Sequence, residues 1–131
     1  MKRTITVVAA VIKNENEQVF TALRSEKMAE ANLWEFPGGK VKQGEQLEEA
    51  LRREIHEELD CDIVVKDKIT DTVYEYSDKI VHLHTFWATL TSGVPKATEH
   101  DEVRWCTFNQ LKELRWAPAD VETVEKITSS C

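Results

Sequence analysis

Three glutamates stand close together in the middle of the chain, and their spacing suits metal chemistry. Glu54, Glu57 and Glu58 lie at i, i+3 and i+4, so on a helix their side chains point to one patch. Such carboxylates repel each other unless a cation neutralises them, and hard oxygen ligands suit Mg²⁺ or Mn²⁺, which also bridge phosphate oxygens. The pattern indicates either a metal site for phosphate chemistry or a solvent-facing acidic helix in which Arg53 and Glu57 form an i,i+4 pair.

The helix that would carry these acids is the clearest one that the sequence predicts. Apolar residues recur with helical periodicity between positions 46 and 59; they are Leu47, Ala50, Leu51, Ile55 and Leu59. Glu54 and Glu58 continue the row that Leu47 and Leu51 begin, whereas a merely solvated face would place its acids opposite the apolar stripe. The acids therefore extend a side of the helix that begins as core.

A glycine-containing loop precedes this helix. Gly38-Gly39-Lys40 and Gly44-Glu45 flank the helix start, and glycine permits backbone conformations that other residues cannot reach at a close phosphate or metal approach. The full pattern is Gly39, five residues, Glu45, seven residues, then Arg53-Glu54-Ile55-His56-Glu57-Glu58. It resembles the Nudix box, whose many fixed positions make the match specific.

The chain is similar to the MutT-like and CTP pyrophosphohydrolase-like branch of the Nudix hydrolases over nearly its whole length. The similar segments outside the box are Arg24, Leu33-Trp34-Glu35-Phe36-Pro37, His82-Leu83-His84, Glu99-His100, Trp105-Cys106 and Ala117-Pro118-Ala119-Asp120. Two positions differ from the expected pattern. Asp60 stands where the Nudix box has a glycine, and Gln46 occupies the expected N-cap position, where serine or threonine would cap the helix more strongly. Because neither changes a metal ligand, we expect a modest loss of stability and intact chemistry.

The resemblance implies the Nudix fold, an α/β fold of the α+β type in which a mixed β-sheet is sandwiched between α-helices, as a single domain over residues 1–131. It also implies that Glu54, Glu57, Glu58 and the carbonyl of Gly39 hold Mg²⁺, with Mn²⁺ as a possible substitute.

Two further residues are implied around that metal. Glu45 would lie behind the ligands, and Arg53 would hold the glutamates in place through a charge-assisted hydrogen bond. Glu99, six residues before Trp105 on a loop, resembles a catalytic acid of the branch and is a further candidate metal ligand. Either Glu58 or Glu99 could serve as the general base.

For the substrate, the resemblance places Lys40 and Arg24 near the phosphates, although exposed solubilising charge explains either residue. Phe36 and Tyr76 match base-contacting positions, and core packing explains them equally well. Asp120 matches a position that contacts the base, and its alternative role is a first-turn acid favoured by the helix dipole. An ionised Asp120 would only accept hydrogen bonds and would favour bases that offer NH donors, such as cytosine or oxidised guanine.

The implied reaction is metal-assisted attack of water on the β-phosphorus of a nucleoside triphosphate, which yields the monophosphate and pyrophosphate. Oxidised or non-standard nucleotides such as 8-oxo-dGTP, or CTP and dCTP, are the expected substrates. Three alternatives stay open: hydrolysis of a nucleoside diphosphate derivative such as ADP-ribose, a non-catalytic nucleotide sensor, and a structural domain whose acidic helix binds Ca²⁺. The complete set of glutamates argues against the sensor.

Other elements follow from periodicity and from turn residues. We expect strands over 4–12, 19–23, 63–76, 80–90 and 102–107, a loop over 24–32, a hairpin turn at 77–79, helical turns over 108–114, and a last helix over 118–128 with a proline near its first position.

Two strand histidines, His82 and His84, share one face of their strand and could form a second metal site. No cysteine or carboxylate stands at ligand spacing near them in the sequence, which favours packed or hydrogen-bonded side chains near the base pocket. His56 and His100 are expected at the surface.

Composition narrows the class of partner. A net charge of −7 disfavours a nucleic acid polymer, whereas a small nucleotide is compatible if a divalent metal reverses the local field. The start of the chain resembles neither a signal peptide nor a membrane span, and Cys61, Cys106 and Cys131 lack metal or redox spacing. We expect a cytoplasmic protein without membrane contact that is a monomer or a weak homodimer.

Overall fold

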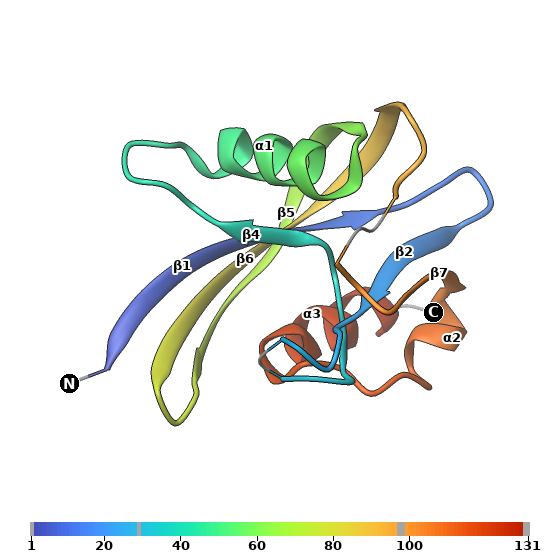
Figure 1. Cartoon of the computed structure of the whole chain (residues 1–131). Coiled ribbons are helices and arrows are strands. Elements are labelled where there is room, and N and C mark those ends of the chain that lie inside the picture. The colour runs from blue at the N-terminus through green and yellow to red at the C-terminus, as the bar shows by residue number, and fades with distance from the viewer. Residues whose placement is uncertain (1, 29, 97–98, 130–131) are drawn as a thin grey trace.

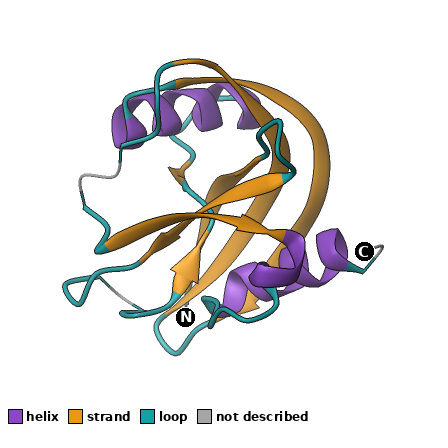
Figure 2. Ribbon diagram, turned by 90° about the vertical axis from the view of Figure 1, so that its right-hand side faces the viewer, coloured by secondary structure: helices purple, strands orange, loops and turns teal. Residues whose placement is uncertain are grey.

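The computed structural model describes residues 2–28, 30–96 and 99–129. Two sheets lie between the longest helix and a group of shorter helices, as Figure 1 and Figure 2 show. The elements in chain order are β1 (Arg3–Ile12), β2 (Gln18–Leu23), β3 (Trp34–Glu35), β4 (Gly38–Lys40), α1 (Leu47–Leu59), β5 (Asp62–Glu75), β6 (Lys79–Ser92), β7 (Glu102–Thr107), α2 (Phe108–Leu111), the 3₁₀ turn η1 (Pro118–Asp120) and α3 (Val121–Thr128).

The larger sheet is mixed, with strand order β4-β1-β6-β5. β1 pairs in parallel with β6 and antiparallel with β4, while β5 and β6 form a long antiparallel hairpin. This confirms the predicted mixed sheet between helices. β2, β3 and β7 form a separate antiparallel sheet in the order β3-β2-β7, which the sequence did not predict.

Two clusters of buried side chains fill the space between the layers. The apolar face of α1 packs on one cluster, with members that include Val8, Phe20, Leu51, Ile55 and Phe86. The other cluster packs against α2 and α3, with members that include Val11, Ile69, Leu83, Leu111 and Ile127. None of the helices in the described ranges is long and apolar enough to cross a membrane.

Each cluster contains one cysteine. Cys61 and Cys106 are free and buried, with exposed fractions of 2% and 0%. Burial raises the pKa of Cys61 to about 11, and the charges of Asp62 and Asp60 add to the effect. Cys131 lies outside the described residues.

Both ends of α1 carry the residues that the sequence indicated. Gln46 is the N-cap residue, and its N–H donates to the Glu49 carboxylate at 3.3 Å, as in one half of a capping box. Asp60 ends the helix at φ 54° and ψ 44°. This is the left-handed region, which a residue with a Cβ adopts at a cost.

Asp60→Gly is therefore expected to raise the melting temperature by about 1–3 °C, since glycine adopts this conformation freely although it also loosens the unfolded chain. Thermal unfolding measures the change, and Asp60→Ala is the matched control that should lower the melting temperature. The kcat of Asp60→Gly should equal that of the parent. A large change in rate would mean that Asp60 contacts the reacting groups.

Candidate active site

The glycines before α1 allow the backbone to approach a carboxylate very closely. A Cβ added to Gly39 would lie 2.4 Å from the carboxyl carbon of Glu54, and one added to Gly38 would lie 1.9 Å from the carbonyl oxygen of Val8. Both distances are shorter than real Cβ contacts, so a side chain at Gly38 would push β1 away from β4, and a side chain at Gly39 would displace the Glu54 carboxylate. The close fit places the Gly39 backbone beside a predicted metal ligand.

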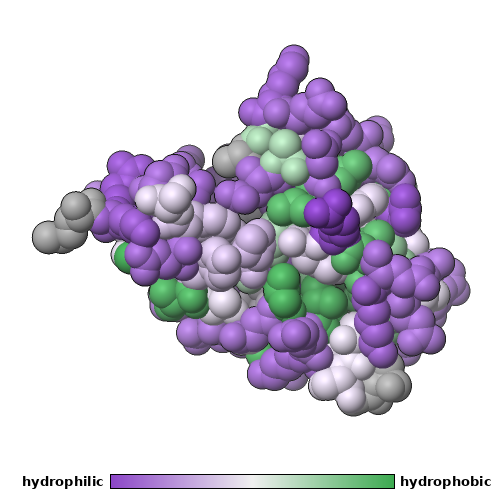
Figure 3. Space-filling model, turned by 90° about the horizontal axis from the view of Figure 1, so that it is seen from below, coloured by the Kyte–Doolittle hydropathy of each residue, from purple (hydrophilic) through white to green (hydrophobic). Residues whose placement is uncertain are grey.

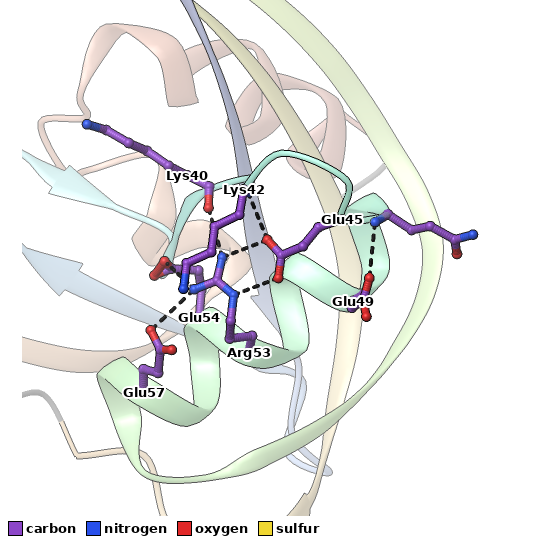
Figure 4. A network of polar contacts seen from close by, with 8 residues as sticks. Lys40, Lys42, Glu45, Glu49, Arg53, Glu54 and Glu57 are labelled. Atoms are coloured by element: carbon purple, nitrogen blue, oxygen red, sulfur yellow. Dashed lines mark hydrogen bonds and ion pairs between the residues drawn. The ribbon is translucent and has the colours of Figure 1, made fainter.

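Arg53 holds the neighbouring acids in a fixed arrangement, which Figure 4 shows. Its Nε and Nη2 donate to the two oxygens of Glu45 at 2.7 and 2.9 Å, and Nη2 also donates to the carbonyl of Lys40 at 3.0 Å. Nη1 donates to Glu54 and to Glu57, each at 3.2 Å. The hydrogen bond from Arg53 is the largest cause that lowers the pKa of Glu45 to about 2. One planar guanidinium thus links the loop to two of the three α1 acids.

The three glutamates of α1 have different surroundings. The side chains of Glu54 and Glu58 are 19% and 18% exposed, whereas that of Glu57 is 53% exposed. Within the described ranges the oxygens of the three glutamates do not all lie within 4.8 Å of one another. Glu54 and Glu58 are the two that face the interior.

Glu58 has an unsatisfied oxygen. Its Oε1 is buried and has no hydrogen-bond partner among the described residues. Burial raises the pKa of Glu58 to about 7; the nearby charge of His100 opposes this shift, and the carboxylates of Glu35 and Glu54 add to it. A buried carboxylate of this kind is stabilised in its ionised form by a cation.

A chain of partly buried polar side chains leads to Glu58. Nη1 of Arg24 donates to one oxygen of Glu35 at 2.5 Å, and the other oxygen of Glu35 lies 2.7 Å from Nε2 of His100. Nδ1 of His100 faces Oε1 of Glu58 at 3.9 Å. Burial alone would lower the pKa of His100, but the hydrogen bond and charge of Glu35, together with the charge of Glu58, raise it above its ordinary value.

The expected surface position of His100 is therefore wrong, since its side chain is only 2% exposed. Its partner Glu35 lies 65 residues away in the chain, a separation at which spacing alone indicates no contact. Arg24 is also more than an exposed charge, because its side chain is 22% exposed and ion-paired. His56 is exposed, as predicted.

These groups surround a pocket of about 510 Å³. Most of the predicted site residues line it, namely Arg24, Phe36, Gly39, Lys40, Glu54, Glu58, Tyr76, Glu99 and Asp120. Arg53 and Glu57 do not, because they lie on the outer side of the acidic cluster. Apolar side chains of β1 and β6, including Val7, Val81 and Leu83, form a wall. Seen from below, the molecule has apolar atoms near the centre of the face and hydrophilic groups around them (Figure 3).

Asp120 is buried where the pocket meets α3. Its carboxyl accepts a hydrogen bond from the N–H of Phe36, but burial, aided by the charge of Glu35, raises the pKa of Asp120 well above its usual range. Burial therefore makes uptake of a proton by Asp120 easier than for an exposed aspartate, and an ionised Asp120 would act only as an acceptor. A protonated carboxyl has one O–H donor as well as acceptor capacity.

The aromatic residues near Asp120 both pack and line the pocket. Phe36 is 3% exposed and its ring lies 4.7 Å from that of Trp116. The hydroxyl of Tyr76 accepts a hydrogen bond from the N–H of Ala119 at 3.3 Å. Core packing and contact with a ligand are therefore compatible for both residues.

His82 and His84 do not line this pocket. Their neighbours Val81 and Leu83 do, because side chains alternate between the two faces of a strand. The expectation that these histidines lie near the base pocket is wrong. They face the other side of β6, beside Asp71.

Comparison with known proteins identifies the family. A family model described as the NUDIX domain matches residues 2–127. The chain belongs to the Nudix family. The CTP pyrophosphohydrolase of Escherichia coli (strain K12) is 35% identical over 94% of this chain and 90% of its own length. The 8-oxo-dGTP diphosphatase of Haemophilus influenzae is 31% identical over 96% and 93%.

Solved structures agree with this family. A MutT protein of the Nudix hydrolase family from methicillin-resistant Staphylococcus aureus is 45% identical, with a TM-score of 0.81 over the whole of both chains. The Escherichia coli ORF135 protein is 33% identical, with a TM-score of 0.83 over 98% of this chain and 91% of that one. This Nudix chain is a hydrolase.

Nudix hydrolases generally depend on a divalent metal, and the residues of this Nudix site fit one. The acidic side chains that line the pocket, Glu54, Glu58 and Glu99, offer oxygen ligands, as hard divalent cations prefer. The buried Oε1 of Glu58 has no partner within the described ranges, and the backbone of Gly39 approaches the Glu54 carboxyl without a side chain between them.

Proposed function

We propose that this Nudix hydrolase uses Mg²⁺ to convert a nucleoside triphosphate and water into a nucleoside monophosphate and pyrophosphate. Its proposed substrates are oxidised or non-standard nucleotides such as 8-oxo-dGTP, or CTP and dCTP. One observation carries the proposal: a single pocket is lined both by acids of α1 and, from other elements, by the buried Phe36 and Asp120 and the partly buried Tyr76. A triphosphate attached to a base needs both of these environments.

The bound metal would neutralise phosphate charge and lower the pKa of a water molecule. Glu54, Glu57 and Glu58, with the carbonyl of Gly39, would hold it. Arg53 orients two of those glutamates through its Nη1. Lys40 and Arg24, which line the same pocket, would bind the phosphate oxygens.

The reaction needs a group that takes a proton from water. Glu58, whose side chain lines the pocket, is the first candidate for this general base. Glu99, which is exposed at the pocket, is the second candidate. The water oxygen bonds to the β-phosphorus, the bond to the α,β-bridging oxygen breaks, and the monophosphate leaves with that electron pair.

The names of the two relatives, CTP pyrophosphohydrolase and 8-oxo-dGTP diphosphatase, support a triphosphate substrate and include both kinds of base. Neither name supports a nucleoside diphosphate derivative, such as ADP-ribose, as the substrate.

Hydrolysis in H₂¹⁸O tests the reaction, with 8-oxo-dGTP, dGTP, dCTP, CTP and ADP-ribose as substrates. Attack at the β-phosphorus places the label in pyrophosphate and leaves the monophosphate unlabelled, which mass spectrometry and ³¹P NMR distinguish. Labelled monophosphate, release of orthophosphate as the first product, or a higher kcat/KM for ADP-ribose than for every triphosphate would overturn the proposal.

Asp120→Ala is expected to narrow the preference between good and poor bases. Loss of one hydrogen bond to the preferred base should cost about 1–3 kcal/mol in its kcat/KM, while poor bases lose less. Asp120→Asn is the matched control, because an amide also offers a donor and an acceptor and should keep most of the preference. An equal fall for 8-oxo-dGTP, dGTP, dCTP and CTP would show that Asp120 is structural.

A further inference from the structure

Three ligand-type side chains meet on the outer surface of the β5–β6 hairpin, away from the pocket. Asp71, His82 and His84 each offer one potential ligand atom, and these three atoms all lie within 4.8 Å of one another. Within residues 2–28, 30–96 and 99–129, no other group of three His, Cys, Asp or Glu side chains meets this criterion. Nε2 of His82 is 3.3 Å from Oδ1 of Asp71, and the two imidazole rings are 4.2 Å apart.

The register of the hairpin explains why Asp71 faces the histidines. Thr70 and Thr72 both donate to Glu122 of α3, so Asp71, between them, points to the opposite face of the sheet. Asp71 is directly opposite His84 in the ladder, after register shifts between Val65 and Lys68 and between Lys68 and Thr70. Each one-residue shift moves the later side chains to the other face, so the two together restore the alternation and displace the register by two residues, which places Asp71 instead of Ile69 opposite His84. The irregularity in β5 thus brings the carboxylate to the histidines.

The cluster already binds a cationic group. Nζ of Lys68 lies 2.9 Å from Nδ1 of His84 and 3.4 Å from Oδ2 of Asp71. The ammonium of Lys68 can only donate, so Nδ1 of His84 faces it as an acceptor and directs its lone pair into the cluster. Lys68 has a long, partly exposed side chain, which can move away from the cluster at small cost.

We propose that Asp71, His82 and His84 form a binding site for a divalent transition metal of the zinc class, separate from the metal of the α1 glutamates. Two imidazoles and one carboxylate are ligands that Zn²⁺ takes, whereas Mg²⁺ prefers oxygen alone. Two ligand atoms on one tetrahedral zinc are about 3.3 Å apart, as Oδ1 of Asp71 and Nε2 of His82 are. A water molecule would complete the coordination.

This location has a structural consequence. The metal would join β5 to β6 on the face opposite Val81 and Leu83, two residues of the pocket wall. It lies outside the proposed catalytic residues, so the two sites can be tested independently.

The test is a calorimetric titration of Zn²⁺ into the full chain with Mg²⁺ in excess, so that Mg²⁺ competes at the carboxylates of α1. We expect one Zn²⁺ site, which His82→Ala and His84→Ala each weaken by about tenfold or more. His56→Ala is the matched control, because His56 is an exposed histidine that also lies beside an aspartate, with its Nδ1 3.1 Å from Oδ1 of Asp62. It should leave Zn²⁺ affinity unchanged.

Lys68→Ala provides an independent arm. Removal of an ammonium that competes with the metal should tighten Zn²⁺ binding by roughly tenfold, an amount that allows for solvent screening. In the parent protein, the imidazole NMR signals should shift on addition of Zn²⁺, and this measurement requires no variant. Equal Zn²⁺ affinity in the His82, His84 and His56 variants, loss of binding when Mg²⁺ is in excess, or weaker binding in Lys68→Ala would overturn the proposal.

Discussion

Glu58→Gln is expected to lower kcat by about 10²-fold or more, since it removes a charge that stabilises the metal and the reacting phosphate. The same change should raise the melting temperature of the metal-free protein at pH 8 by about 2–4 °C. The stability gain arises because the buried Oε1 of Glu58 has no partner within the described residues. A neutral amide avoids the cost of burying that charge.

The difference in stability between Glu58→Gln and the parent should depend on pH. The pKa of Glu58 rises from 4.5 to about 7 on folding, so the fold favours the protonated carboxyl. This contribution to stability is complete below pH 4.5 and is lost as the pH rises through about 7. Parent and Glu58→Gln should therefore be similar at pH 4.5 and differ increasingly up to about pH 7.

Melting curves at pH 4.5, 6 and 8, with and without Mg²⁺, measure this effect. Mg²⁺ should stabilise the parent more than Glu58→Gln. Glu57→Gln is the comparison: it should lose activity similarly and gain no stability, since the side chain of Glu57 is 53% exposed. Full activity in both variants would remove these glutamates from the metal site.

Arg53→Lys is expected to lower kcat by roughly 10- to 100-fold, the range seen when a residue that orients metal ligands is lost. Arg53 donates at the same time to Glu45, Glu54, Glu57 and the carbonyl of Lys40. A lysine ammonium has three donors at one point and cannot span these four positions. The charge remains in Arg53→Lys, so a loss of rate reports lost geometry.

Mg²⁺ titrations of activity distinguish positioning from simple charge. Arg53→Lys should require more Mg²⁺ for half-maximal rate, while Arg52→Lys, an exposed neighbour on the same helix, should match the parent. A normal rate and normal Mg²⁺ requirement in Arg53→Lys would show that charge alone suffices at this position.

The parts of the site that lie close together in the chain could be predicted from sequence. Glu54, Glu57 and Glu58 are brought together by helical periodicity, and Arg53 reaches Glu45 because a short loop leads directly into the helix. Local spacing determines these contacts. The left-handed end of α1 at Asp60 also followed from its position after the last apolar residue of the helix.

Contacts between distant segments could not be predicted in this way. His100 reaches Glu35 across 65 residues, and Asp71 reaches His82 only after register shifts in β5. Periodicity assigns side chains to faces within one element, but it does not show which elements pair. The second sheet was missed for a related reason, because β3 has two residues, too few to show an alternating pattern.

The burial of Cys61 and Cys106 has a consequence for an enzyme that would act on oxidised nucleotides. Peroxide reacts with the thiolate, and access to solvent governs the rate as well. With a pKa of about 11, Cys61 is almost entirely a thiol at neutral pH, and Cys106 has no exposed surface. Both sulfurs should therefore oxidise slowly, so that these two positions remain intact under the conditions that damage the nucleotide pool.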